Sequence, residues 1–229
     1  MIVGNGLLAK SFMHYKDDNN ILIFASGVSN STSPTKLDCS REQKLLENTI
    51  EMNMHKTIIY FSSCDIANDK LNENPYYIHK NNMELIVKSQ SKNYYIFRLP
   101  QVIGKGGNKN TLMNFLVNSI KNRSEFTLYK QTFKSIIDIT DVIKMCDYII
   151  DNNLYKSQII NIINPNYISV ESIVKEIETF LKIAANYNTK LVVNNPNYDV
   201  NISKEISKEI LIDFDVNYLS KILFKYYNE

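Results

Sequence analysis

Tyr76 and Lys80 are the two residues of the sequence whose types and spacing are best suited to chemistry. They lie four positions apart in the segment NPYYIHKNNMELI, residues 74–86. On a helix, residues four apart share a face, so the ammonium of Lys80 can lie beside the phenol of Tyr76. A nearby positive charge favours the phenolate form of a tyrosine. A tyrosine tuned in this way can pass a proton to or from an alcohol or sugar oxygen while a hydride moves to a nicotinamide.

The spacing alone does not identify an enzyme, because Y-x-x-x-K occurs often by chance on amphipathic helices. Tyr77 has Asn81 four residues after it and therefore lacks the same partner. His79, which lies between the tyrosine and the lysine, is expected to be a solvated side chain rather than an acid. The chemical interpretation therefore depends on the other motifs of the sequence.

A second motif, FSSCD, ends a predicted central strand with Ser62, Ser63, Cys64 and Asp65. In an open α/β sheet, ligands bind at the carboxyl ends of the strands. Serines at the end of a strand also serve commonly as turn formers or helix caps. The motif thus lies where a substrate could bind, although its residue types do not require one.

A third motif, VGNGLLA at residues 3–9, places Gly4, Gly6 and Ala9 between a predicted strand and a predicted helix. Glycine lets the backbone turn tightly and approach a pyrophosphate, and alanine permits close packing of the helix on the strand. The start of the helix would then face the phosphates. By itself the motif fits a structural turn equally well, but its position at the N-terminus favours nucleotide binding.

The elements that must position these motifs alternate along the first part of the chain. Apolar runs predict strands at residues 1–3, 21–26, 57–63 and 94–99, and helical patterns lie between them at 7–15, 40–54 and 76–90. Strands without polar alternation, each followed by a helix, are typical of a parallel sheet that is covered on both faces. The fold class expected is a Rossmann-like α/β sheet with helices on both faces.

After Pro100 the pattern is less regular. Helices are expected at residues 111–122, 141–152, 169–182 and 216–226, and strands at 126–130, 135–139, 158–163 and 190–193. Ser169 is expected to cap the third of these helices. The sequence therefore predicts a dinucleotide-binding core at residues 1–104. Residues 105–229 are expected to form a small, mixed, substrate-binding part, with elements that return to the core.

Composition excludes several other classes of protein. The net charge of +2 and the pI near 8.2 give no case for a nucleic-acid partner, since no long block of one sign occurs. No apolar run reaches about 18 residues, so no membrane span is expected. Cys39, Cys64 and Cys146 are odd in number and widely spaced, which predicts neither a disulfide framework nor a metal site. A reducing cytoplasm is the expected location.

Taken together and in this order, the three motifs resemble the extended short-chain dehydrogenase/reductase family, the NAD-dependent sugar epimerase/dehydratases. The likeness also includes Glu84, four residues after the lysine, and the segment RLPQVIG, residues 98–104. Further on, FKSIIDITDV at residues 133–142 resembles the family's R-D-Y-I-H-V-x-D-V segment. The likeness covers nearly the whole chain, and its most specific parts are the Tyr–Lys segment and RLPQVIG.

The resemblance implies roles for the residues already named. Tyr76 would be the catalytic acid or base, and Lys80 would orient the nicotinamide ribose and lower the pKa of the tyrosine. Ser63 or Ser62 would hydrogen-bond the reacting oxygen, and the doubled serine leaves that choice open by one residue. The cofactor would be NAD or NADP, bound by the two catalytic residues together with Gly4, Gly6, Leu7, Leu8, Ala25, Ser26, Gly27 and Val102.

The same resemblance implies a nucleotide-diphosphate sugar as substrate. Lys134 takes the place of an arginine that often binds the diphosphate, and the helix with NFLV, which starts at Asn114, would lie over the sugar nucleotide. Other substrate contacts would come from Cys64, Asp65 and Gln101. A homodimer is expected through the helices at 40–54 and 76–90. Besides the resemblance, this expectation rests on a set of apolar residues on these helices: Met83, Leu85, Ile86 and Val87.

One region departs from the family pattern. Members usually carry two more strand–helix units after the glycine turn, with a residue that reads the adenosine ribose, whereas here only the loop KDDNN, residues 16–20, separates the first helix from the next strand. The adenosine side is therefore expected to be shortened, with Lys10, His14 and Lys16 as possible substitutes, and the choice between NAD and NADP stays open. The first crossover must then run on an unusual face if it is to stay right-handed.

Several reactions fit this pattern. The SSC and PYYIHK segments resemble the GDP-fucose synthase branch, in which Cys64 would be the epimerisation cysteine, but no histidine follows RLPQVIG to act as its partner. Dehydratases use an Asp–Glu pair, whereas Asp65 offers one carboxylate. A reductase of a 4-keto-(6-deoxy)sugar in surface polysaccharide biosynthesis needs only Ser, Tyr and Lys, so it fits with the fewest missing parts. A nucleotide-sugar 4-epimerase needs the same residues. Two alternatives belong to other classes of protein. One is a non-catalytic nucleotide-sugar or dinucleotide sensor, and the other is a partner subunit of a polysaccharide enzyme complex.

Overall fold

The chain forms two compact units. The computed structural model describes residues 1–28, 34–67, 73–106, 108 and 110–228. The first unit consists of Met1–Leu99 and Ile143–Ile162, and the second of Pro100–Val142 and Ile163–Glu229. The division at residue 104 that the sequence suggested stays a prediction about domains.

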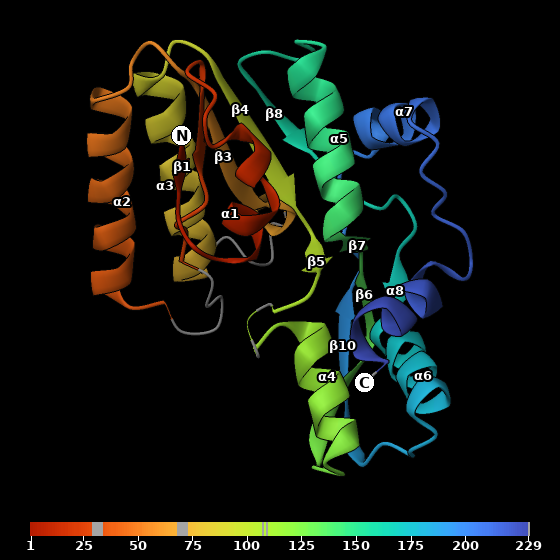
Figure 1. Cartoon of the computed structure of the whole chain (residues 1–229). Coiled ribbons are helices and arrows are strands. Elements are labelled where there is room, and N and C mark those ends of the chain that lie inside the picture. The colour runs from red at the N-terminus through yellow and green to blue at the C-terminus, as the bar shows by residue number, and fades with distance from the viewer. Residues whose placement is uncertain (29–33, 68–72, 107, 109, 229) are drawn as a thin grey trace. The chain divides into compact units, whose positions relative to one another are not determined.

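The first unit is built on a parallel sheet, drawn in Figure 1. Its strand order is β1-β2-β3-β4-β8, and every neighbouring pair is parallel. The strands are β1 (Ile2–Val3), β2 (Ile21–Phe24), β3 (Thr57–Ser63), β4 (Tyr94–Leu99) and β8 (Gln158–Asn161). The expected Rossmann-like parallel sheet is confirmed.

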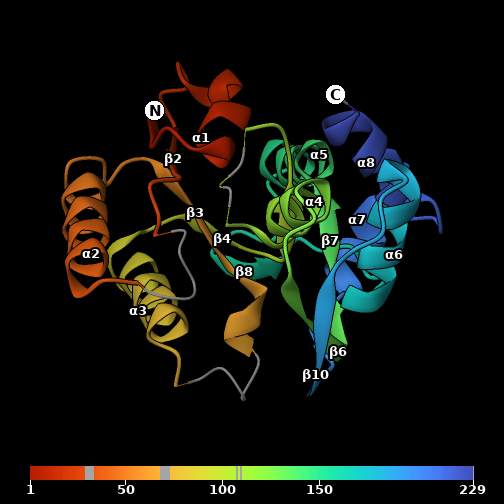
Figure 2. The ribbon, with the colours of Figure 1, turned by 90° about the horizontal axis from the view of Figure 1, so that it is seen from below.

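Helices cover both faces of this sheet, as the view in Figure 2 makes clear. One face carries α2 (Lys36–Glu51) and α3 (Pro75–Gln90), while α1 (Leu7–Ser11) lies on the other. The 3-10 turn η1 (Met13–Tyr15) follows α1 and contacts the part of α5 (Ile139–Asp151) that belongs to this unit. There Tyr15 donates a hydrogen bond to Asp151 over 3.1 Å. The helix expected at residues 7–15 is thus shorter than predicted, because it changes to a 3-10 turn.

The two sheet faces have different cores because successive side chains of a strand point to opposite sides. On the α2–α3 side, β3 contributes Ile58 and Tyr60 to a fully buried cluster, whose other members are Leu22, Phe24, Leu46, Ile50, Met83, Val87 and Ile96. On the α1 side, Phe61 packs against Phe12 with ring centroids 5.1 Å apart. Each such side chain contributes about 1.5–3 kcal/mol when it is buried. The cluster accounts for the continuous apolar runs of the sequence.

Local capping sets where the two large helices begin. The Thr35 hydroxyl accepts the Asp38 N–H over 3.0 Å at the start of α2. Asn74 accepts the Tyr76 N–H over 2.8 Å at the start of α3, and Pro75 occupies the first helical position, where no N–H is needed. The helix α2 therefore begins at residue 36 instead of the expected 40.

The first crossover has the hand opposite to that of the next two. The connections β1–α1–β2, β2–α2–β3 and β3–α3–β4 all advance the same way along the sheet. Two connections that advance in one direction on opposite faces have opposite hands, and α1 lies on the face opposite to α2 and α3 (Figure 2). The alternative, a right-handed crossover on an unusual face, is not the one that this chain adopts.

The second unit contains two small sheets and four helices that lie wholly within it. The sheets have the orders β10-β6-β9 and β5-β7. The elements are β5 (Gln101–Ile103), α4 (Leu112–Lys121), β6 (Phe126–Lys134), β7 (Ile136–Asp138), β9 (Ile168–Ser169), α6 (Val170–Leu181), β10 (Tyr187–Asn194), α7 (Asn201–Glu209) and α8 (Tyr218–Tyr227). Ser169 caps α6 as expected, because its hydroxyl accepts the Ser172 N–H over 3.0 Å. The sequence did not predict β5, β9 or α7.

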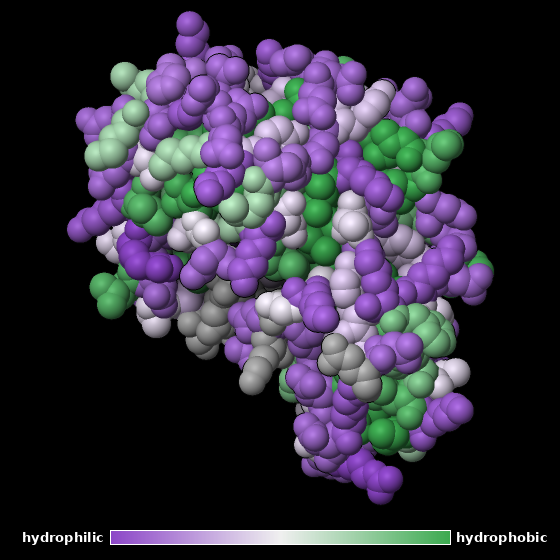
Figure 3. Space-filling view, viewed as in Figure 1, coloured by the Kyte–Doolittle hydropathy of each residue, from purple (hydrophilic) through white to green (hydrophobic). Residues whose placement is uncertain are grey.

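The outer surface of α2 and α3 carries apolar side chains. Hydrophobic residues reach the surface over α2 (Figure 3), where Leu37 is 79% and Met52 80% exposed. On α3, Leu85 is half exposed, but Met83 and Val87 are fully buried. The expectation that Met83 and Val87 are exposed and available for a dimer interface is therefore wrong, because both pack into the core of the unit.

None of the described helices is both long and apolar enough to cross a membrane.

Candidate active site

Ser62 lies on the face of the sheet that α3 covers. In the parallel register, Ser62 pairs with Arg98, and the Arg98 side chain reaches Glu84 of α3 over 2.7 and 2.8 Å. Paired residues of a parallel ladder point to the same side, so Ser62 points toward α3 as well. Its hydroxyl is buried and has no hydrogen-bond partner among the described residues. A buried polar atom without a partner is rare, and it marks a place where a ligand can supply the missing bond.

The three residues that follow Ser62 have partners inside the protein. The Ser63 hydroxyl accepts the Asp65 N–H over 3.3 Å, as in an ordinary turn. The Cys64 thiol is buried and contacts the Arg98 carbonyl over 3.2 Å, and burial raises its pKa well above the usual value. Asp65 accepts a hydrogen bond from the Tyr77 hydroxyl over 3.1 Å. Of the two serines, Ser62 is therefore the one whose buried hydroxyl has no partner among the described residues.

Tyr76 and Lys80 share a face of α3, as their spacing predicts. The Lys80 Nζ lies 5.9 Å from the centroid of the Tyr76 ring. Burial raises the pKa of the Tyr76 hydroxyl, the Lys80 charge lowers it, and Glu42 and Asp65 raise it further. The net direction is upward, so the hydroxyl is protonated at neutral pH.

Lys80 is buried in a cluster that the sequence did not reveal. Its ammonium donates to a Glu42 oxygen over 3.0 Å and to the Tyr60 hydroxyl over 3.1 Å. Tyr60 in turn donates to Glu42 over 2.9 Å. His79 also contacts Glu42, over 2.9 Å, and is only 8% exposed, so the expectation that it is a solvated side chain is wrong. The reason is tertiary: α2 and α3 close over these polar groups.

The cluster is ionised. Burial alone would raise the pKa of Glu42, but the hydrogen bond from His79, the Lys80 charge and the Val28 N–H together lower it to about 2. Burial alone would lower the pKa of Lys80, but Tyr60 and Glu42 prevail and raise it. The result is a carboxylate and an ammonium in direct contact. Because an ammonium has three N–H groups, Lys80 keeps one without an acceptor in the described part of the chain.

Three glycines after β1 and β2 differ in the space around them. A Cβ on Gly27 would lie 2.6 Å from the Lys80 Nζ, so any larger residue there would displace the ammonium. Gly4 has φ +126°, and a Cβ there would meet the Ala25 carbonyl oxygen at 2.4 Å. A Cβ on Gly6 would meet nothing within 4 Å. The other residues expected to bind cofactor, Leu7, Leu8, Ala25 and Ser26, follow β1 or β2 directly, and all four are half-buried.

These features fit only one half of a bound dinucleotide cofactor. Among the described residues, the spare Lys80 donor and the unpartnered Ser62 hydroxyl suit the nicotinamide half, and the open space at Gly6 suits the pyrophosphate. On the adenosine side β1 is the edge of the sheet, and among the described residues no strand pairs with its outer edge. Of the suggested substitutes there, Lys10 and Lys16 are exposed, and His14 contacts Asp147 over 3.1 Å.

Four expected site residues belong to the second unit and are described within it. The Gln101 N–H donates to the Ser135 carbonyl, and Val102 is half-buried. Asn114 accepts a hydrogen bond from the Tyr227 hydroxyl over 2.6 Å and donates one to the Asn108 carbonyl. Lys134 is half-buried at the end of β6, opposite Ile168 in the ladder.

No group of three or more His, Cys, Asp or Glu that could hold a metal ion occurs in the part of the chain that the structure describes.

The NAD-dependent epimerase/dehydratase family model matches residues 39–162, just over half of the chain. No curated protein matches the sequence. Three solved structures illustrate the likeness in fold. An NAD-dependent NDP-hexosamine 5,6-dehydratase of tunicamycin biosynthesis has a TM-score of 0.75 at 14% identity, over 94% of this chain and 79% of that one.

The second structure is a UDP-glucuronic acid 4-epimerase from Bacillus cereus, in complex with UDP-glucuronic acid and NAD. It has a TM-score of 0.70 at 17% identity, over 95% of this chain and 76% of that one. The third, a dTDP-4-dehydrorhamnose reductase from Bacillus anthracis in complex with NADP, has a TM-score of 0.66 at 14% identity, over 96% and 85%. At such low identity these likenesses show the fold.

Proposed function

The chain belongs to the NAD-dependent epimerase/dehydratase family, and we propose that within it this protein is an NAD(P)-dependent reductase of a nucleotide-linked 4-keto sugar. One observation carries the proposal. Ser62 and Arg98 point to the α3 side of the sheet, where the buried Ser62 hydroxyl has no partner in the described part of the chain, and α3 presents Tyr76 and Lys80 on one face. A reductase of a keto group needs these three side chains and no others.

The protonation state of Tyr76 supports reduction over oxidation. The raised pKa of its hydroxyl keeps the proton in place at neutral pH, so Tyr76 can act as the general acid. Ser62 would hold the keto oxygen by its free hydroxyl. Lys80 would donate its remaining N–H to a ribose hydroxyl and so orient the cofactor, NAD or NADP, which in its reduced form would supply the hydride. Tyr76 then donates its proton to the developing alkoxide.

The other reactions of the family find less support in these residues. A 4-epimerase, such as the Bacillus cereus relative in fold, is the second candidate because it needs the same three side chains. It must first remove a proton from an alcohol, which needs Tyr76 as a phenolate, whereas the hydroxyl is protonated in this site. Epimerisation by Cys64 is disfavoured too, since its thiol is buried, and Asp65 is a single carboxylate where dehydratases use two.

The remaining parts of the proposal concern the substrate, the biosynthetic role, the location and the oligomeric state. Two of the relatives in fold are named for UDP- or dTDP-linked sugars, which supports a nucleotide-diphosphate sugar as substrate, with Lys134 as a contact to the diphosphate. We expect a role in surface polysaccharide biosynthesis in the cytoplasm. A homodimer through α2 and α3 is supported by the exposed Leu37 and Leu85 on these helices and by the exposed Met52 directly after α2.

The proposal is tested by incubating the protein with a panel of nucleotide-linked 4-keto sugars and either NADH or NADPH, followed by identification of the products. A reductase consumes one reduced cofactor for each sugar alcohol that forms. Conversion of a 4-hydroxy sugar into its C4 epimer without net consumption of cofactor would instead identify the epimerase. Cofactor binding without turnover of any substrate would favour a sensor, and the absence of cofactor binding would refute both enzymes.

A further inference from the structure

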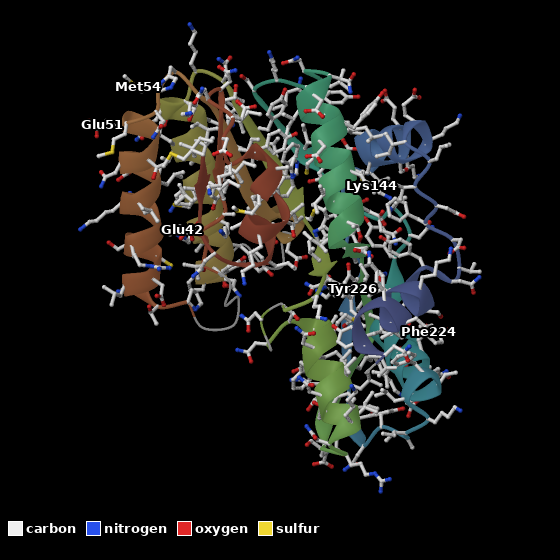
Figure 4. All side chains as sticks on the ribbon, in the orientation of Figure 1. Glu42, Glu51, Met54, Lys144, Phe224 and Tyr226 are labelled. Carbon is white, nitrogen blue, oxygen red and sulfur yellow. The ribbon has the colours of Figure 1, made fainter. Side chains whose placement is uncertain are left out.

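Glu42 is the most heavily hydrogen-bonded carboxylate among the described residues of the first unit. It projects from α2 toward α3 and the sheet (Figure 4) and is 0% exposed. Its two oxygens interact with four groups from three places in the fold: the Val28 N–H after β2 at 2.6 Å, the Tyr60 hydroxyl of β3 at 2.9 Å, and His79 and Lys80 of α3 at 2.9 and 3.0 Å.

Packing alone gives no reason for an acid at this position. One turn further along α2, Leu46 fills the space against the sheet with an apolar side chain. Burying a charge is unfavourable unless it is paired and hydrogen-bonded, and an apolar residue of similar size is often at least as stabilising. The pair of Glu84 with Arg98 is the simpler case, because a single arginine bonds both oxygens of that carboxylate through its Nε and Nη2. Glu42 instead collects donors from three places in the fold, and one of these donors, Tyr60, also accepts a hydrogen bond from Lys80.

We propose that Glu42 is a positioning residue that holds the Lys80 ammonium beside Gly27 and fixes the backbone after β2 through the Val28 N–H. The inference rests on the proposed function, in which Lys80 binds the nicotinamide ribose. Lys80 reaches Gly27 so closely that a Cβ would lie 2.6 Å from its Nζ and 3.2 Å from a Glu42 oxygen. Glu42 thus sets the position of the one Lys80 N–H that has no acceptor among the described residues.

Charge compensation follows from the same contacts. The carboxylate cancels the charge of the ammonium, and the pair presents an N–H donor without a net positive charge. Such a donor suits a neutral hydroxyl, as on a ribose, better than a phosphate, which binds most strongly to uncompensated lysine or arginine. Glu42 therefore selects for the sugar of the nicotinamide half and against a phosphate at this place.

The test compares Glu42→Gln with wild type by titration of NADH fluorescence and by calorimetry with two halves of the cofactor. Reduced nicotinamide mononucleotide should bind about tenfold more weakly to the variant, the factor that corresponds to about 1.4 kcal/mol. Adenosine diphosphate should bind as it does to wild type. Glu84→Gln is the matched control, because Glu84 is a second buried carboxylate and belongs to α3, the helix that carries Lys80. It should lower the melting temperature without changing the affinity for either half.

The pH dependence of NADH binding gives a second readout that a purely structural role would not move. In Glu42→Gln the buried Lys80 loses its counter-charge, so its pKa should fall and binding should weaken as the pH rises above neutral, whereas wild type should show no such loss. Glu42→Asp keeps the charge and should restore the wild-type profile. The groups that face Lys80 from the elements around it are Cys39 and Glu42 of α2, Tyr60 of β3, and Tyr76 and His79 of α3.

Three outcomes separate the possibilities. If wild type binds neither NADH nor NADPH, the proposed function fails and the inference fails with it. If wild type binds and Glu42→Gln binds both halves equally well at every pH, the proposed function stands and the inference is refuted. Should Glu42→Gln not fold, Tyr60→Phe replaces it, because it removes one of the two Lys80 acceptors and keeps every charge. Because Glu42 still holds Lys80 in Tyr60→Phe, affinity for reduced nicotinamide mononucleotide should stay near that of wild type, and a tenfold loss would assign the positioning to Tyr60 and refute the inference.

Discussion

Acid should destabilise the wild-type protein more than a variant without the buried Glu42–Lys80 pair. The variant carries Glu42→Gln together with Lys80→Met, so that neither partner is left as an unpaired charge in the core. Replacing both members of a buried ion pair is often neutral or stabilising, whereas removal of one member alone is strongly destabilising. The double variant is therefore expected to fold at neutral pH.

The magnitude follows from the pKa of Glu42. Its pKa in the folded protein is about 2, against an ordinary value of 4.5. The two values differ by about 2.5, and at about 1.4 kcal/mol for each pH unit this corresponds to about 3 kcal/mol. Because the folded-state pKa is lowered, this stability is fully present above pH 4.5 and is lost as the pH falls toward 2. The carboxylate is 0% exposed, so solvent screens the effect little.

The measurement is urea denaturation of both proteins at a series of pH values between 7 and 2.5. The free energy of unfolding of wild type, relative to that of the double variant, should fall by up to about 3 kcal/mol through this window. Glu51→Gln, on the exposed side of α2 (Figure 4), is the control and should follow wild type. If wild type and the double variant lose stability in parallel below pH 4.5, the buried pair is not ionised as described and the reasoning is wrong.

Four further predictions address the proposed function. Tyr76→Phe should lower kcat by about 10²–10⁴-fold with the fold intact, whereas Tyr77→Phe should keep most of the activity; the reverse result would place the acid at Tyr77. Gly6→Val should weaken cofactor binding without loss of stability, because the new side chain enters open space, and unchanged affinity would exclude Gly6 as a contact. Lys134→Ala should raise the KM for a sugar nucleotide by the equivalent of roughly 1.5–3 kcal/mol and leave cofactor affinity alone; a fall in cofactor affinity instead would contradict its assignment. Light scattering at micromolar concentration should give the mass of a dimer, and a monomer would exclude the interface through α2 and α3.

The sheet of the first unit was predictable because its signals are local. The strands β3 and β4 have the bounds that the apolar runs predict, since β-branched and aromatic residues continue without polar alternation up to Ser63 and Leu99. The caps at Thr35 and Asn74 are local as well, and Thr35 followed by Asp38 could have given the start of α2. The strands β5 and β9, of three and two residues, were missed because so short a run has no periodicity to detect.

The candidate site was predictable only in part, because its decisive contacts are distant in the sequence. Tyr76 and Lys80 are one helical turn apart, and that pairing could be read directly. Glu42 lies 38 positions before Lys80, on a helix whose other acids are solvated, and no spacing rule joins the two. Ser62 is distinguished from Ser63 by the face of the strand to which each points, which requires the sheet register.

The hand of the first crossover explains why the nicotinamide side of the site should dominate cofactor binding. With the usual intermediate strands missing, β1 joins β2 directly through α1, which stays on the face of α5 instead of crossing to that of α2. An opposite-handed connection is rare because a twisted strand and a long helix pack poorly that way, but α1 has only five residues, and the contact of Tyr15 with Asp151 holds the following turn. The result leaves β1 at the edge, with no neighbouring strand among the described residues to carry an adenosine-binding acid. We therefore expect affinity to depend on Lys80 and its Glu42 partner to an unusual degree, so that the half-cofactor titrations are the measurements on which the functional assignment turns.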